Sequence, residues 1–439
     1  MMRQFLLALL SLVPAAGAEL RTWTNTDGRA IRAELLAVED GNALFEFEGK
    51  RSSVPLLKLS ELDRAYIADE WVPPFDYGNF RRGGKPWPAA VDLLPGATEV
   101  EVINAEPEKR NFVYRTKNFE FTSDAELAGS TMKNVSECFE ATYLLLQSLP
   151  WSVPSRTEDE RLFPASLFEH FSDYVKSGGP PNSGGVYKRQ EDRFYVPFKS
   201  LGLKKKSGRY FRADRFDVDV LVHEVTHMMM AKQLAYLPIW VIEGSAEFTS
   251  SMPYSAGRFR CDDTDKGLRD YLEQYGRGRG GTAFSMRDLR GILEMSREEW
   301  GSRSQASSSE QHRLYAAAFV LFYYFEHLDD RSKGYAMHEF FHRAAGEGRR
   351  WEPYWAAMKK YRGEIAEFKK LPEVETTKNG GFRYPSSLTP PARPKPPEPG
   401  GYDDSVCYLH IDLLFRGRTE IEILTDLATK MDKRLRIKL

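Results

Sequence analysis

Two short motifs near the middle of the chain contain residue types that bind metal ions and transfer protons. The first, His-Glu-x-x-His, places His223 and His227 four positions apart, with Glu224 beside the first histidine. On a helix, residues four apart project from one face, one turn apart. Two imidazole nitrogens in that arrangement can reach one Zn²⁺ at about 2.0–2.1 Å. Glu224 is then close enough to take a proton from a water on the metal without being a ligand.

The second motif, Trp-x-x-Glu-Gly-x-Ala-Glu, covers residues 240–247 and supplies a further metal ligand. A catalytic zinc needs a third protein ligand and leaves its fourth position for water. The break at Leu237-Pro238 is predicted to end a first helix over Val220–Ala235. A second helix, starting at or near Trp240, would return antiparallel and present Glu243 to the same metal.

Two more residues of this stretch are expected to support the site. Gly244 would let the two helix backbones approach closely. Glu247, one turn after Glu243, would accept the second N–H of a ligand histidine and so select its tautomer.

The alternative to a metal site is a histidine pair that only packs in the core. A chance His-Glu-x-x-His in a chain with 8 histidines has a probability on the order of one per cent.

Together the two motifs resemble those of the gluzincin zinc metallopeptidases, which include thermolysin-like enzymes and many aminopeptidases. The resemblance implies His223, His227 and Glu243 as zinc ligands and Glu224 as general base and acid. Only 15 residues separate His227 from Glu243, fewer than in the best-known aminopeptidases. No aminopeptidase-type Gly-x-Met-Glu-Asn segment precedes the motif, so exopeptidase specificity is not supported.

A related class of zinc peptidases is excluded by two positions. A metzincin requires a glycine at position 230 and a histidine at position 233, whereas this chain has Met230 and Gln233.

The gluzincin resemblance also suggests residues around the cleft. Tyr315, near the start of an apolar helix predicted over Gln311–Leu328, is expected to donate to the tetrahedral oxyanion, and a packing tyrosine is the alternative. His312, one turn away, is a second candidate for that role. Residues 193–198 are the candidate edge strand that pairs with the substrate backbone. The Gly-rich loop 177–185 is expected to overhang the cleft, with ordinary sheet and turn as the alternative.

Composition and the N-terminus indicate the compartment and exclude some partners. The 439 residues carry a net charge of −1, from 62 basic and 63 acidic side chains, so no nucleic-acid or anionic-membrane partner is expected. Residues 1–18 combine one arginine, a short apolar core and Ala16-Gly17-Ala18, which predicts a signal peptide. The protein is therefore expected to be secreted or periplasmic and bacterial, with no transmembrane segment after cleavage. Its 3 scattered cysteines do not form a disulfide framework.

Residues 19–72 are predicted to form a small β module followed by a short helix. Alternating runs at 20–24, 30–39 and 43–48, separated by Asp-Gly turns, indicate strands. Ser52–Leu56 is a further strand, and Ser60 caps a helix over Glu61–Asp69. The pattern resembles the SH3-like homology domain common in exported bacterial proteins. That resemblance implies a cell-wall or protein ligand, and a module that only packs is the alternative.

The whole chain is expected to have an α+β fold with a small N-terminal SH3-like β-barrel. A linker over 73–99 would precede a gluzincin-like metallopeptidase domain over 100–375, in which a sheet is followed by the zinc-site helices. A Pro-rich linker over 376–400 would then lead to a small C-terminal appendage over 401–439. In that appendage, alternating runs at 408–415 and 434–439 suggest strands around a short helix.

These observations predict an exported zinc-dependent metallopeptidase that hydrolyses protein or peptide substrates. Two alternatives stay open. One is a cell-wall peptide amidase that uses the same zinc chemistry, and the other is a non-catalytic exported binding protein on a peptidase scaffold. Substrate preference, activation and oligomeric state do not follow from the sequence.

Overall fold

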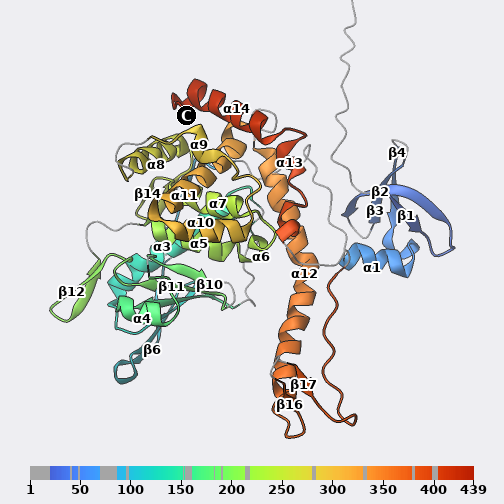
Figure 1. The fold of residues 1–439 in the computed structure, drawn as a ribbon, viewed down its shortest axis with the longest axis horizontal. Helices are drawn as coiled ribbons and strands as arrows, with labels where there is room; N and C mark the ends of the chain where they lie inside the picture. Colours follow the sequence, from blue (N-terminus) through green and yellow to red (C-terminus); the bar gives the residue numbers. More distant parts are fainter. Residues whose placement is uncertain are drawn as a thin grey trace, which may run out of the picture. The chain divides into compact units, whose positions relative to one another are not determined.

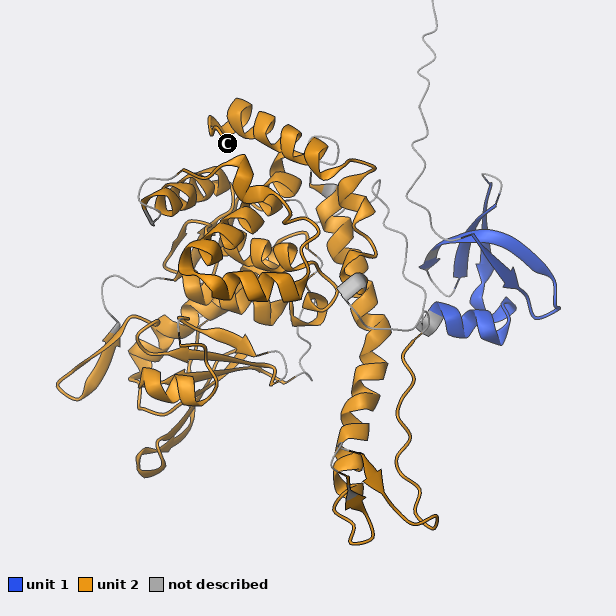
Figure 2. Cartoon of the chain, viewed as in Figure 1, with its two compact units in different colours: residues 1–80 blue, residues 81–439 orange. Residues whose placement is uncertain are grey.

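The computed structural model divides the chain into two compact units, residues 1–80 and 81–439 (Figures 1 and 2). It describes residues 20–39, 42–47, 50–69, 87–94, 98–151, 153, 161–181, 183–188, 191–212, 218–278, 283–329, 334–377, 381–397 and 404–439. The predicted signal peptide lies outside these residues, as does most of the predicted linker over 73–99. Within the described part, no helix is both long and apolar enough to cross a membrane.

The first unit contains the predicted antiparallel sheet. Its four strands pair in sequence order: β1 (Arg21–Thr24), β2 (Ala30–Glu39), β3 (Asn42–Phe47) and β4 (Lys50–Pro55). Alternate residues of these strands, including Trp23, Leu35 and Phe45, are buried on one face and form the core of this unit. Helix α1 (Glu61–Asp69) is attached to β1 because Asp63 accepts a hydrogen bond from the Thr24 backbone N–H at 2.6 Å.

The second unit is built on a six-stranded mixed sheet in the order β10-β11-β9-β8-β7-β6. Its strands are β6 (Glu101–Glu106), β7 (Asn111–Arg115), β8 (Phe119–Ser123), β9 (Phe163–Phe168), β10 (Val186–Lys188) and β11 (Arg193–Pro197). β8, β9 and β11 run parallel, and the remaining pairs are antiparallel. The α+β class is confirmed. The predicted edge strand is wrong, because β10 pairs along the outer side of β11 and is itself the edge.

Helix α3 (Gly129–Ser148) packs against this sheet through aromatic rings. Phe139 meets Phe119 and Phe121 edge-on, at centroid distances of 5.4 and 5.0 Å. The core continues from α3 into a helical layer made of α5 (Asp219–Met229), α6 (Ala231–Leu234), α7 (Ile239–Ser250) and α11 (Ser308–Tyr323). The two motifs therefore lie on helices supported from one side by the sheet and from the other by α11.

The second unit contains further strands and helices, among them α12 (Tyr335–Phe368), which is the longest helix of the described residues. They are β5 (Ala90–Asp92), β12 (Leu203–Lys206), β13 (Arg209–Arg212), α4 (Phe171–Lys176), β14 (Tyr254–Ser255), β15 (Arg258–Arg260), α8 (Thr264–Gly278), α9 (Met286–Leu289), α10 (Arg297–Ala306), α12 (Tyr335–Phe368), β16 (Glu375–Thr376) and β17 (Phe382–Arg383). β16 and β17 lie beside the end of α12, where Phe382 packs on Phe368 with centroids 5.7 Å apart. All three cysteines are buried thiols.

The end of the chain forms a helix where a short helix is expected, near residues 425–431, whereas the strands suggested at 408–415 and 434–439 are absent and that part of the prediction is wrong. This end forms α13 (Asp412–Phe415) and α14 (Glu420–Lys430). Ile423, Leu424 and Leu427 are buried in the core of the second unit. Their spacing of three and four residues places them on one helix face, which outweighs the short alternating run before them.

Candidate metal centre

The first motif lies on α5, which is shorter than predicted. The helix ends at Met229 and a separate turn, α6, follows, whereas the sequence suggested one helix to Ala235. Pro238 is the N-cap of α7, a position that needs no backbone N–H from it. The predicted break and the second helix, starting at Ile239, are confirmed. Buried hydroxyls of Thr226 on α5 and Thr249 on α7 hydrogen-bond at 2.8 Å and hold the two helices together.

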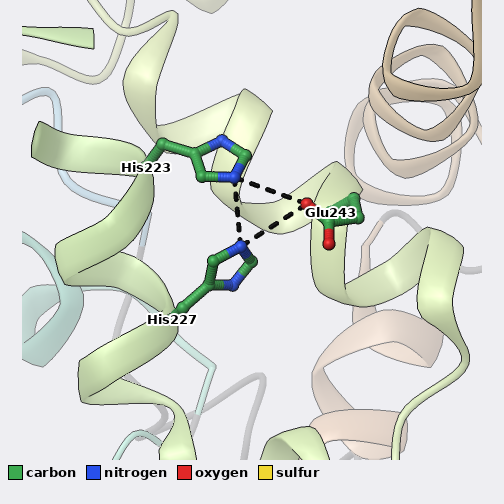
Figure 3. Close-up of side chains that lie close together, drawn as sticks. All are labelled: His223, His227 and Glu243. Carbon is green, nitrogen blue, oxygen red and sulfur yellow. Dashed lines mark hydrogen bonds and ion pairs between the residues drawn. The ribbon is translucent and has the colours of Figure 1, made fainter. Parts of the chain in front are cut away.

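The three predicted ligands converge on one point (Figure 3). His223 Nε2 and His227 Nε2 are 3.0 Å apart, and Glu243 Oε2 lies 3.4 and 3.5 Å from them, respectively. Their side chains are only 11–12% exposed. These residues form a candidate metal site. Among the described residues, it is the group of histidine, cysteine, aspartate or glutamate side chains that lie close enough together to hold a metal ion.

The distances between these three atoms fit a single small ion. Ligand atoms bonded to a tetrahedral ion at about 2.0–2.1 Å are separated from each other by about 3.3–3.4 Å. The observed separations of 3.0, 3.4 and 3.5 Å lie around that value. Glu243 Oε2 is buried and accepts no hydrogen bond of normal geometry from the described residues. A buried carboxylate oxygen without such a donor, facing two imidazole nitrogens, is the arrangement expected of a cation ligand.

The electrostatics of the cluster favour positive charge. Burial alone would lower the pKa of His223, but the carboxylates of Glu243 and Glu247 raise it well above its usual value. Burial would raise the pKa of Glu243, but the charges of His227 and His223 hold it far below its usual range. The site therefore keeps an ionised carboxylate beside the two imidazoles.

Glu247 contacts the other side of a ligand histidine, as expected. Its Oε1 lies 3.1 Å from His223 Nδ1, so the Nδ1–H can donate to it and leave Nε2 free for a metal. Tyr271 on α8 hydrogen-bonds to Glu247 in turn, and burial and then the Glu247 charge raise the pKa of that tyrosine well above its usual value. Three side chains thus form a chain, Tyr271 to Glu247 to His223, from the core to the ligand cluster.

Glu224 is held by the edge of the sheet. Its Oε2 accepts a hydrogen bond from the backbone N–H of Tyr187 on β10, at 2.9 Å. The carboxylate therefore lies between the edge strand and the ligand cluster, and both Glu224 and Tyr187 line the same cavity as the ligands.

That cavity has a volume of about 980 Å³ and two walls that are distant in sequence. One wall comes from residues 180–181, 183 and 185–187, so the Gly-rich loop predicted to overhang the cleft borders it. The other comes from residues 304–315 and includes both His312 and Tyr315. The Tyr315 ring lies 6.0 Å from that of His223, and the Glu243 charge, with burial, raises the pKa of its hydroxyl well above the usual value. The phenol is a hydrogen-bond donor at neutral pH.

Gly244 is required for a reason that differs from the predicted one. A Cβ at this position would lie 2.5 Å from the Ala318 carbonyl oxygen and 2.8 Å from Phe322 Cβ, both on α11. The glycine therefore allows α7 to approach α11, and the three atoms nearest to such a Cβ all belong to that helix rather than to the histidine helix. This close contact of α7 with α11 is next to a candidate ligand, since Glu243 is the preceding residue.

Neither models of known protein families nor curated protein sequences give a match to this chain.

Two parts of the site could not be found from the sequence. Tyr271 belongs to an amphipathic helix with no local motif, and its spacing is the same as that of a packing residue. The Tyr187 contact uses a backbone N–H, which carries no side-chain signal at all.

Proposed function

We propose that the protein is an exported zinc-dependent metallopeptidase of the gluzincin type that hydrolyses peptide bonds. The observation that carries this proposal is the convergence of His223, His227 and Glu243 within a cavity that also contains a glutamate, Glu224, and a phenol, Tyr315. A metal site with only a structural role is closed by its ligands, whereas a catalytic one opens to substrate.

The donor set agrees with zinc. Two imidazoles and one carboxylate suit this ion, and a bound zinc would supply Lewis-acid polarisation and a lowered pKa for water. His223, His227 and Glu243 would hold it, and Glu247 would orient His223.

The remaining steps belong to side chains of the cavity. Glu224 would take a proton from the attacking water as the new C–O bond forms, and give that proton to the leaving amine as the C–N bond breaks. The Tyr187 backbone N–H orients this carboxylate. The Tyr315 hydroxyl would donate to the oxygen of the attacked carbonyl as its charge develops.

Export and a tethering role for the N-terminal sheet complete the proposal. The sequence of residues 1–18 supports export, and the four-stranded sheet with its helix supports a binding module of the SH3-like kind, for a cell-wall or protein ligand.

Two measurements on purified protein test the function. Elemental analysis should find about one zinc per chain. The wild type should hydrolyse casein while Glu224→Gln, which keeps the shape of the side chain, should lose the activity by about 10²- to 10⁴-fold. Peptidoglycan is assayed in parallel to identify an amidase. A zinc-loaded wild type no more active than Glu224→Gln on either substrate would rule out both hydrolase functions.

A further inference from the structure

The cavity wall formed by the end of α10 and the start of α11 carries amides, hydroxyls and one imidazole, that of His312, but no carboxylate, ammonium or guanidinium group among its described lining residues. Gln305, Ser308 and Gln311 line it, and their side chains are exposed and make no hydrogen bond to the rest of the described chain. Ser304 and Ser307 extend the same surface. Ser307 Oγ caps α11 by accepting from the Glu310 backbone N–H at 3.1 Å, and its own hydroxyl hydrogen is still available to donate.

The charged residues next to this wall form ion pairs with each other. Arg303 lies 2.7 Å from Glu310 and 3.1 Å from Glu299, and Arg313 lies 2.9 Å from Glu310. These four side chains contact each other and do not line the cavity. The charge near the wall is therefore neutralised within the two helices.

The described lining of the cavity contains no lysine, arginine or aspartate, and its two glutamates, Glu224 and Glu243, belong to the proposed chemistry. A charged substrate side chain placed against Gln305, Ser308 and Gln311 would lose water without gaining an opposite charge from these residues. A large apolar side chain would cover amides and hydroxyls without replacing their hydrogen bonds to water. A side-chain amide or hydroxyl would meet matching donors and acceptors.

We infer that the substrate presents an uncharged hydrogen-bonding side chain, that of Asn, Gln, Ser or Thr, to this wall beside the cleaved bond. Gln305 and Gln311 are the specificity-determining residues. This inference rests on the proposed peptidase function and adds the class of peptide that it selects. A side chain that is matched with one or two hydrogen bonds should be preferred about tenfold over one that is not.

The test uses four peptides that differ at a single position next to the expected cleavage site, occupied by Gln, Leu, Lys or Glu. Each residue position flanking the bond is varied in turn. Hydrolysis by the full-length zinc-loaded protein is measured as kcat/KM. Binding of the same peptides to Glu224→Gln is measured by fluorescence polarisation, which gives a readout independent of activity. At one flanking position the Gln peptide should exceed the Leu, Lys and Glu peptides by about tenfold in both measurements.

The double variant Gln305→Leu/Gln311→Leu should abolish that preference or reverse it toward Leu. Its matched control is Gln274→Leu, an exposed glutamine on α8 outside the cavity, which should keep the wild-type ranking. Circular dichroism and the melting temperature confirm that each variant is folded.

The outcomes separate the inference from the function. Casein hydrolysis with a preference for Leu, Lys or Glu at every position overturns the inference and leaves the peptidase intact. Selective binding of the Gln peptide without hydrolysis of any substrate overturns the proposed peptidase function. It supports the inference that this wall selects an uncharged hydrogen-bonding side chain. If no peptide is bound or cleaved, both are wrong.

Discussion

Glu247 Oε1 lies 3.1 Å from His223 Nδ1, while Glu243 Oε2 lies 3.4 Å from Nε2 of the same ring. One imidazole is therefore held between two carboxylates that are one helical turn apart on α7. The outer carboxylate can orient the ring, and the inner one is a candidate ligand beside it. A change at Glu247 would therefore act on a bound metal through His223.

Removing a ligand should remove the metal. In His223→Ala, zinc content measured by elemental analysis should fall from about one per chain to near zero, because two ligands alone bind zinc weakly. The matched control is His170→Ala, a histidine whose side chain is 60% exposed and lies outside the cluster. That control should keep its zinc. Equal zinc in both variants would show that the metal binds elsewhere.

Removing the hydroxyl of Tyr271 should weaken zinc binding without touching a ligand. In Tyr271→Phe, Glu247 loses a hydrogen bond and holds His223 less firmly. Partners behind a ligand typically contribute about 10- to 100-fold to metal affinity, so the dissociation constant from chelator competition should rise about tenfold.

Tyr324→Phe is the control for this effect. Tyr324 is also buried, and its hydroxyl donates to Asp426 at 2.6 Å, away from the ligand cluster. This variant should lose stability but keep the zinc affinity of the wild type. If both variants weaken zinc equally, the effect reflects general destabilisation and Tyr271 has no positioning role.

Removing the hydroxyl of Tyr315 should slow catalysis and leave the metal in place. In Tyr315→Phe the developing oxyanion loses a donor, and kcat should fall by about 10²-fold, whereas KM should change little. Zinc content should match that of the wild type, and Tyr384→Phe, at an exposed tyrosine on another part of the chain, should have normal activity. An unchanged kcat in Tyr315→Phe would leave this residue with a packing role.

A methyl group at Gly244 should destabilise the protein. In Gly244→Ala the added Cβ would overlap the Ala318 carbonyl oxygen at 2.5 Å, so α7 must shift from α11. Overpacking of this kind costs about 1–3 kcal/mol of unfolding free energy, measurable by urea titration. The shift should also weaken zinc binding, since Glu243 is the neighbouring residue.

Gly363→Ala is the matched control in a helix. Gly363 lies in α12, and a Cβ there meets no atom within 4 Å. Alanine should stabilise this position by up to about 1 kcal/mol, because it forms helices better than glycine does. Destabilisation of similar size in both variants would mean that the close approach at Gly244 is not the cause.

The ligand cluster could be predicted from the sequence because its geometry is local. A four-residue helical spacing, a proline that ends one helix and an acid early in the next helix are enough to bring His223, His227 and Glu243 together. The small N-terminal sheet was predictable for the same reason, since turn residues separate its alternating strands.

The rest of the site depends on contacts between distant segments. The sequence places the edge of the sheet at residues 193–198, because the three residues of β10, Val186–Lys188, are too few to stand out as a strand. Tyr271 reaches Glu247 only through the packing of α8, and Gly244 is explained by a helix, α11, that follows much later in the chain. Periodicity identifies such helices but does not tell which faces will meet.

The division of the cavity between two sets of segments has a consequence for how the protein can change over time. The candidate ligands and Glu224 lie on α5 and α7, and Tyr315 lies on α11. Most of the other residues that line the cavity belong to residues 180–181, 183, 185–187 and 304–312. Substitutions in those walls can therefore alter which peptides are accepted while the ligand cluster stays intact. Selection for different substrates would act on the Gly-rich loop and on the junction of α10 with α11. The helices that carry the candidate ligands, α5 and α7, could then keep their sequence.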